Sequence, residues 1–370
     1  RMGFYTSQLT DNDDILSLQY ATSNFSGTNA LVGSYEAPLA LDGRLRWGVN
    51  GSWSQYFADQ FGATLLPDAF TGFSWSGGGD LRLNVYQDGP LFVDVIGGGR
   101  LQHLGIENNI LWWLPQEEAS FAIPYGMVQM DRDGEWSSFR ASVGIEGNVL
   151  SHDDSQLAFL GAATNRPNLA NLWARLNWSG SVSTYLEPLL NNRAWSDPAS
   201  ADSSTLAHEV YFGTSGQYAF GNRLMPQFQA VSGGPGTNRG YPVSVAAGDN
   251  AVNFTGEYRF HVPRSFAVQP QPGTLFGEPF RYAPQRMYGR ADWDLMLLGF
   301  VDYSWLTKND KVAVIGETDQ TLISAGVGFE FQFKRNMRVR LDWGWALRSL
   351  EGGLYDAGHN RVYVQASLSF

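Results

Sequence analysis

The chemistry that this sequence offers is ionic. Arg239 lies in a stretch that also holds Gly233, Gly234 and Gly240, and a glycine-rich stretch is flexible enough to fold back onto the rest of the chain. Further along, Asp302 is a carboxylate that could receive this cation. A guanidinium and a carboxylate shielded from water form a specific pair, because two parallel hydrogen bonds join them. Whether the two residues meet depends on the elements that carry them.

Asp302 lies in a segment whose side chains alternate with a period of two, which is typical of a β-strand. In this segment Phe300 and Asp302 fall opposite an apolar face made of Leu295, Leu297, Val301, Tyr303 and Trp305. In segment 252–262, Glu257 and Arg259 likewise fall opposite an apolar face made of Val252, Phe254, Tyr258 and Phe260. We therefore expect Glu257 and Arg259 to face the same space as Asp302 and to extend its ionic contacts.

The same alternation recurs along the whole chain. Its clearest examples are 44–53, 172–182, 323–332, 338–347 and 361–370, and the face opposite the apolar one holds mainly Arg, Asn, Ser and Gly. A lumen would carry such small and polar residues. A soluble β-sandwich has the same period, with its apolar face inside, so periodicity alone does not separate the two folds.

Composition and the positions of aromatic residues favour a membrane barrel. Charged residues make up 16% of the chain, against roughly 25% in an average soluble domain, while hydrophobic residues reach 43%. No apolar run reaches about 18 residues, which excludes a protein with membrane-spanning helices. Trp and Tyr gather at the ends of alternating segments, where an interfacial girdle would lie: Tyr20, Tyr35, Trp53, Tyr56, Trp75, Tyr86, Trp112, Trp113, Trp305 and Trp345. We predict an all-β fold, a transmembrane antiparallel β-barrel in contact with outer-membrane lipid.

The length suits a single barrel. At about 23 residues per strand with its connection, about 16 strands are expected, an even number as in such barrels. Turns are expected at polar clusters such as 151–155 and 191–204. Segment 263–290 holds too many prolines for a ladder strand, namely Pro263, Pro270, Pro272, Pro279 and Pro284. We expect one domain over 1–370, no periplasmic domain in this chain, and a periplasmic position for 263–290, where other subunits could bind.

Other function classes find little support. The net charge of -11 argues against nucleic acid as a partner, because phosphate binding needs a basic surface. The five histidines show no triad spacing, so no catalytic residue and no enzymatic activity is expected. Asp11, Asp13 and Asp14 resemble a fragment of a calcium loop but lack its Gly and distal Glu, so neither a metal nor a cofactor is expected.

The stretch from Ser232 to Tyr241, with the sequence SGGPGTNRGY, resembles the loop motif of the two-partner secretion and outer-membrane assembly superfamily. Gly299 to Tyr303 resembles the Phe-x-Asp strand of that family, and segments 324–329 and 341–344 resemble its last strands. The chain is most similar to the barrel of the two-partner secretion transporters. It departs from the family pattern at Asn238, where Val is usual, and at Ser304, where Gly is usual.

The resemblance implies a position and a role for the motif. It implies that loop 232–250 folds inward from the extracellular side and plugs the lumen, with Arg239 docked against Asp302. It implies an outer-membrane pore that exports or inserts a secreted or periplasmic polypeptide. Two alternatives stay open from the residues: a structural anchor of a larger envelope complex that binds a partner through 263–290, and a passive diffusion channel.

Overall fold

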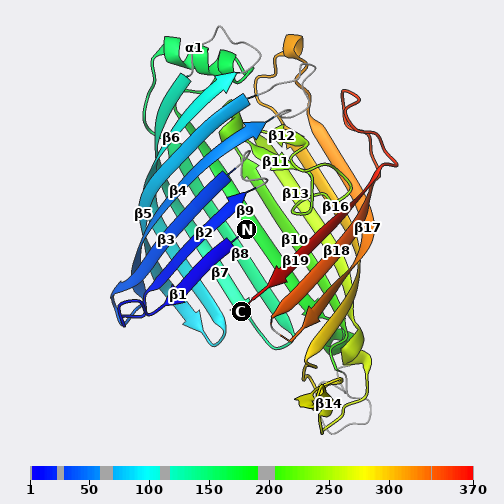
Figure 1. The fold of residues 1–370 in the computed structure, drawn as a ribbon. Coiled ribbons are helices and arrows are strands. Elements are labelled where there is room, and N and C mark those ends of the chain that lie inside the picture. The colour runs from blue at the N-terminus through cyan, green and yellow to red at the C-terminus, as the bar shows by residue number, and fades with distance from the viewer. Residues whose placement is uncertain are drawn as a thin grey trace.

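The computed structural model describes residues 2–22, 29–58, 70–108, 117–190, 205–334 and 336–369. Its elements, shown in Figure 1, are β1 (Met2–Ser7), β2 (Ile15–Thr22), β3 (Asn29–Ala40), β4 (Leu45–Ala58), β5 (Phe70–Asp88), β6 (Leu91–Asn108), β7 (Glu117–Asp133), β8 (Ser137–Asn148), α1 (Asp154–Ala163), β9 (Trp173–Tyr185), α2 (Glu187–Leu190), β10 (His208–Tyr218), η1 (Pro226–Phe228), β11 (Ala230–Ser232), β12 (Ala246–Gly248), β13 (Asn250–His261), η2 (Val262–Ser265), β14 (Gly273–Leu275), β15 (Glu278–Phe280), β16 (Trp293–Thr307), η3 (Ala313–Ile315), β17 (Gln320–Phe333), β18 (Met337–Ala346) and β19 (Asn360–Leu368).

Fifteen of these strands form one antiparallel sheet that curls around an interior (Figure 1). Its order follows the sequence from β1 to β10, then runs through β13 and β16 to β19, and β11–β12 and β14–β15 are separate hairpins. The expected number was about 16. Because neighbours are antiparallel and fifteen is odd, the two edge strands β1 and β19 run in the same direction. No pairing joins these edges among the described residues, so this sheet is not closed.

The two faces of the strands differ as the alternation predicts. In β16 the side chains of Phe300 and Asp302 are buried, at 4% and 1% exposure, whereas Val301 and Tyr303 are exposed at 55% and 37%. Exposed aliphatic and aromatic residues recur on the outer side of the other strands, among them Trp53 and Trp75. An outward apolar face around a more polar interior is the arrangement of a barrel in lipid. The predicted all-β barrel fold is therefore confirmed.

The interior is not polar throughout, which corrects the expectation of a polar lumen. At one end of the sheet the inner side chains of Leu104, Ile106 and Ile123 are buried against α1 and the connection after β10. Helix α1, at the top of Figure 1, follows a segment for which only a turn was predicted. Tertiary packing onto this inner apolar patch stabilises the helix, whose own hydrophobic periodicity is weak.

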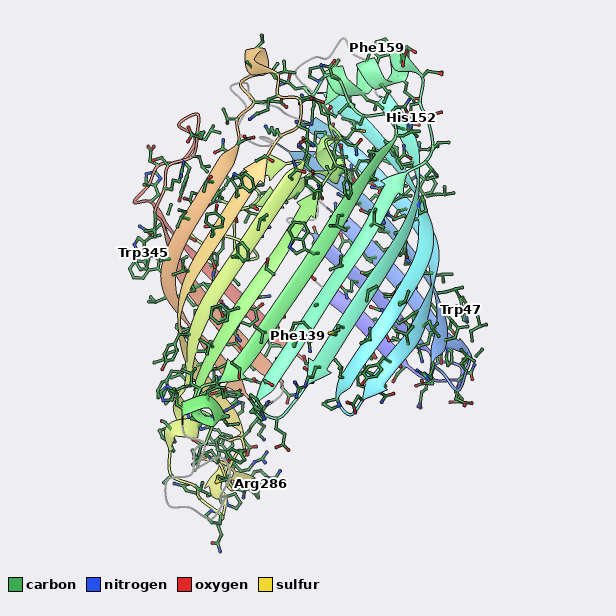
Figure 2. All side chains as sticks on the ribbon, turned by 180° about the vertical axis from the view of Figure 1, so that it is seen from behind. Trp47, Phe139, His152, Phe159, Arg286 and Trp345 are labelled. Atoms are coloured by element: carbon green, nitrogen blue, oxygen red, sulfur yellow. The ribbon has the colours of Figure 1, made fainter. Side chains whose placement is uncertain are left out.

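The proline-rich connection 263–290 lies outside the main sheet, as its composition requires. It contains η2 and the hairpin β14–β15, in which Pro279 stands opposite Thr274. Figure 2 places the labelled Arg286 in this lobe, at the end of the molecule opposite Phe159 of α1. The hairpin is short and shares no ladder with the main sheet, so it accommodates a proline.

Some sequence-based expectations concern other parts of the chain. The turn at 191–204 and the aromatic residues Trp112 and Trp113 lie outside the described residues. Among the residues that are described, neither helix is long and apolar enough to cross a membrane.

The outward face gives a direct test of its surroundings. Val301 lies at the middle of β16, and we expect Val301→Arg to destabilise the protein refolded into phospholipid vesicles by about 2–4 kcal/mol, because the arginine would face the bilayer midplane. The measurement is denaturant-induced unfolding. Val314→Arg, in a loop and 94% exposed, is the control and should change stability by less than about 0.5 kcal/mol. Equal small effects of both substitutions would mean that the outer face meets water.

Candidate functional site

The candidate site is formed by the long connection between β10 and β13, which turns back along the inner side of the sheet (Figure 1). Strands β11 and β12 pair with each other at its neck, from Ala230 opposite Gly248 to Ser232 opposite Ala246. Directly after β11 the chain turns sharply at Gly233 and Gly234, whose φ angles are 112° and 89°. A Cβ at Gly233 would lie 2.2 Å from the carbonyl oxygen of Pro242, so this turn requires glycine.

Arg239 projects from this turn into the inner wall, where its guanidinium has partners on several sides. Nε and Nη2 donate to the two carboxylate oxygens of Asp302 at 2.9 and 2.7 Å, and the backbone N–H of Arg239 donates to the same carboxylate at 3.0 Å. Nη1 pairs with Glu257, and Nη2 also donates to Thr255 at 3.0 Å. The guanidinium carbon lies 3.5 Å from the ring centroid of Phe300. This is a bidentate ion pair with a cation–π contact.

Further charges continue the network on both sides of Arg239. Glu257 also binds Arg259 at 2.7 Å and Arg340 at 3.1 Å. Arg259 in turn pairs with Glu209 at 2.9 Å, and Arg340 pairs with Asp342 at 2.7 Å. The network thus spans β10, β13, β16 and β18. Glu257 and Arg259 were expected here, whereas Glu209, Arg340 and Asp342 were not singled out from the sequence.

Burial makes this network energetically sensitive. Arg239 is 3% exposed and Asp302 is 1% exposed, so neither charge can be satisfied by bulk water. A buried ion pair adds little net stability over an apolar pair of the same shape, but removing one partner leaves an uncompensated charge and destabilises by about 3–5 kcal/mol. The network therefore holds the loop in one place on the wall.

Next to Arg239, the loop backbone lies in close contact with β17 and β18. A Cβ at Gly240 would lie 2.6 Å from the backbone N of Ala346, and a Cβ at Gly344 would lie 2.8 Å from the carbonyl of Arg239. Tyr241 is fully buried, and its hydroxyl donates to the carbonyl of Arg348 at 2.6 Å. The Arg-Gly-Tyr tripeptide thus combines an ion pair, a close backbone approach and a buried aromatic anchor.

The two departures from the family pattern meet each other in space. Asn238 and Ser304 are both fully buried, and Nδ2 of Asn238 donates to Oγ of Ser304 at 3.3 Å. The same amide group also lies 3.3 Å from the carbonyl of Leu322, while the amide oxygen of Asn238 has no hydrogen-bond partner among the described residues. A polar pair thus stands where the family pattern has valine and glycine.

A small cavity of about 310 Å³ lies between the loop and the wall. Thr237 and Arg239 line it from the loop, and Arg338, Arg340 and Gln365 line it from β18 and β19. Arg338 is anchored by Glu330 at 2.6 Å. The inner wall beside the loop is therefore charged, in contrast to the apolar packing below α1.

A second ionic cluster, here called the loop cluster, consists of Arg166, Arg223, Asp249 and Glu317. Arg166 pairs with Asp249 at 2.5 Å and with Glu317 at 2.6 Å, and Arg223 pairs with Glu317 at 2.9 Å. All four side chains are at least 90% buried. Three connections, those after β8, β10 and β16, are tied together by these contacts. No motif in the sequence indicates this cluster, because its members lie up to 151 residues apart.

The histidines have partners in space that the sequence did not suggest. Nδ1 of His103 lies 2.9 Å from the hydroxyl of Ser120, and its Nε2 lies 3.4 Å from Glu118. In a serine hydrolase triad Nε2 faces the serine and Nδ1 faces the acid, so this exposed cluster has the reverse arrangement. In the described part of the chain, no group of three or more His, Asp or Glu is placed to hold a metal ion.

The fold is shared with solved barrels. CdiB from Escherichia coli matches with a TM-score of 0.68 at 13% identity, over 100% of this chain and 59% of that chain. CdiB from Acinetobacter baumannii matches with a TM-score of 0.61 at 15% identity, over 98% of this chain and 56% of that chain. BamA from Haemophilus ducreyi lacking POTRA domains 1–3 matches with a TM-score of 0.60 at 13% identity, over 99% of this chain and 66% of that chain. The chain thus spans less than three fifths of the length of each CdiB.

These likenesses define the class of the fold. No protein-family model and no curated protein matches the sequence. The chain has the barrel fold found in CdiB and BamA, and the predicted resemblance to the two-partner secretion and outer-membrane assembly barrels is confirmed at the level of the fold.

The contact between Asn238 and Ser304 predicts coupling between the two positions. In a double-mutant cycle of Asn238→Val and Ser304→Gly, we expect a coupling energy of about 1 kcal/mol, because each single substitution removes the buried hydrogen bond that joins the two side chains. The measurement is urea-induced unfolding of the refolded barrel. Additive effects of the two substitutions would show that the contact does not contribute to stability.

The loop cluster predicts a response to acid. Burial disfavours the Glu317 carboxylate, but the hydrogen bond from Arg223, the backbone N–H of Val312 and the charge of Arg166 outweigh it and lower the pKa of Glu317 below its usual value. A lowered pKa in the folded state stabilises the cluster above the unfolded value of about 4.3, and this contribution is lost as the pH falls below it through the lower folded pKa.

This response can be followed with spin labels, because the chain has no cysteine. We expect the distance distribution between labels at Phe159→Cys and Val314→Cys, both exposed, to broaden as the pH falls below about 4.3. Glu317→Gln is the matched control: it cannot ionise and should give a broad distribution at every pH. The same acid transition in Glu317→Gln would show that other carboxylates control these loops.

Proposed function

We propose that this chain is the barrel of an outer-membrane pore that moves a polypeptide across the membrane or inserts it there. The observation that carries the proposal is the Arg239 network, which fixes a glycine-rich loop to the inner wall of a barrel of this fold. Lipid faces the apolar outer side, as its exposed residues suggest. The C-terminus and the short hairpin turns at the same end are then periplasmic, and α1 is extracellular.

In this proposal loop 232–250 is the plug of the lumen. The loop lies along β16, β17 and β18, where a network of ion pairs and the buried ring of Tyr241 anchor it. Passage of a chain therefore requires the loop to slide along this wall or the edges β1 and β19 to separate.

The folded connection 263–290 supports the alternative of an anchor subunit. It projects beyond the main sheet and contains its own hairpin, so it offers a surface at the periplasmic end that the barrel itself does not need for closure. The two functions are compatible, because a partner bound there would lie beside the lumen entrance.

The proposed function predicts that disrupting the pair of Arg239 and Asp302 stops the transport of a polypeptide. Deleting the gene in its own bacterium should remove at least one polypeptide from the secreted or outer-membrane fraction, measured by mass spectrometry. The wild-type chain should restore it, and Arg239→Ala or Asp302→Ala should not. The double variant should lose much less than the sum of the single losses, because one pair is disrupted in all three.

The control for this experiment is Arg44→Ala, which removes an exposed arginine in the turn before β4. It should secrete like the wild type. The amount of each variant in the outer membrane is measured in parallel, so that a folding defect of about 3–5 kcal/mol is separated from a transport defect. Unchanged secreted and outer-membrane fractions after deletion would refute the proposal, and steady large conductance of the wild type in planar bilayers would favour a passive channel.

A further inference from the structure

A second, larger cavity lies at the other end of the barrel wall, below the rim formed by β16 and β17. Its volume is about 1130 Å³. The connection between β13 and β16 forms most of it, and the ends of β16 and β17 with the turn after β17 complete it. Pro263, Pro270 and Pro279 are part of this wall, and proline fixes φ, so the backbone of the cavity is stiff.

The cavity is cationic although the chain as a whole carries a charge of -11. Five cations line it, namely Arg264, Arg281, Arg286, Arg290 and Lys334, against the two carboxylates Asp292 and Asp294. Both carboxylates already have a partner: Asp292 pairs with Arg281 at 2.5 Å, and Asp294 contacts His261 at 2.7 Å. Burial disfavours the Asp292 carboxylate, but the hydrogen bonds and charge of Arg281, together with the charge of Lys334, outweigh it and lower the pKa of Asp292 below its usual value.

Three of the cations have no such partner. Within the described residues, no carboxylate lies within ion-pair distance of Arg286, Arg290 or Lys334, and all three side chains belong to exposed residues. Arg264 differs, because it is buried and donates to the hydroxyl of Tyr185 at 2.7 Å. The cavity therefore combines a buried, hydrogen-bonded arginine with three exposed positive charges.

The face of the sheet on which the cavity lies favours an acidic peptide over a lipid headgroup as its ligand. Asp294 and Gln332 stand opposite each other in the register of β16 and β17, on the same inner face as Asp302. Gln332 is in turn opposite Arg338 of β18, which lines the smaller cavity beside Arg239. The inner face of β16 to β18 thus connects this cavity with the smaller one, whose arginines Arg338 and Arg340 are already paired with carboxylates. A lipid headgroup would need the outer face, whereas an extended chain entering the lumen passes along the inner one.

We propose that this cavity receives an acidic segment of the transported polypeptide before it enters the lumen. The inference rests on the proposed function, which makes this end periplasmic. Arg286, Arg290 and Lys334 attract the segment, and the proline walls keep the receiving surface in shape without ordering cost on binding. Because the charges are exposed, they accelerate and orient the encounter rather than hold the segment tightly.

The test uses the full chain in detergent and a fluorescein-labelled peptide of alternating Glu and Ser, with binding measured by fluorescence anisotropy at low salt. We expect the double variant Arg286→Glu/Arg290→Glu to bind about tenfold more weakly than the wild type, because each reversal replaces an attraction with a repulsion. The matched control is Arg44→Glu/Arg132→Glu, which reverses two exposed arginines at the same end of the barrel, one in the turn before β4 and one near the end of β7, and should bind like the wild type.

Three outcomes would overturn the inference. They are equal loss in both double variants, equal binding of a Gln-Ser peptide of the same length, and loss of binding to anionic phospholipid micelles without loss of binding to the acidic peptide. Peptide binding in detergent does not require transport, so its failure leaves the proposed function standing. Conversely, an unchanged secreted fraction after gene deletion would refute transport whatever the peptide does.

Discussion

A guanidinium buried in a barrel wall is the interaction on which the interior of this protein depends. Arg239 is almost out of contact with water, so its charge must be balanced by carboxylates that the fold delivers to it. Asp302 meets it with both oxygens, and Glu257 approaches from a neighbouring strand. Because the arginine comes from a loop and the acids come from strands, the same contacts that neutralise the charge also fix the loop.

The rest of the loop is built to allow this approach. Glycine at 233 and 234 lets the chain turn back at positive φ, and glycine at 240 and 344 lets two backbones lie closer than any side chain would permit. Tyr241 then closes the contact with an apolar ring and a bonded hydroxyl. Asn238 and Ser304 add a buried hydrogen bond between the loop and β16.

The two ends of the barrel differ in whether their charged residues are buried or exposed. At the α1 end, the loop cluster buries two arginines and two carboxylates and ties three connections together above an apolar patch. At the opposite end, the cavity below the rim leaves Arg286 and Arg290 exposed and unpaired among the described residues. One end thus pairs its buried charges internally, and the other leaves positive charges exposed to solvent.

The sequence by itself determined which side chains face outward and which face inward, because side-chain direction in a strand alternates with a period of two and is a local property. It therefore placed Asp302, Glu257 and Arg259 on the inner face, and its glycines marked the loop that carries Arg239. It did not indicate that α1 would form, since that helix depends on packing against Leu104 and Ile106 from distant strands.

Only the tertiary structure decided which charges meet. Arg340 and Asp342 join the Arg239 network because the register of β18 against β17 brings them level with it, and Arg166 reaches Glu317 across 151 residues. Such pairs depend on strand register and on how connections pack over the end of a curled sheet. These are non-local quantities, and no period in the sequence encodes them.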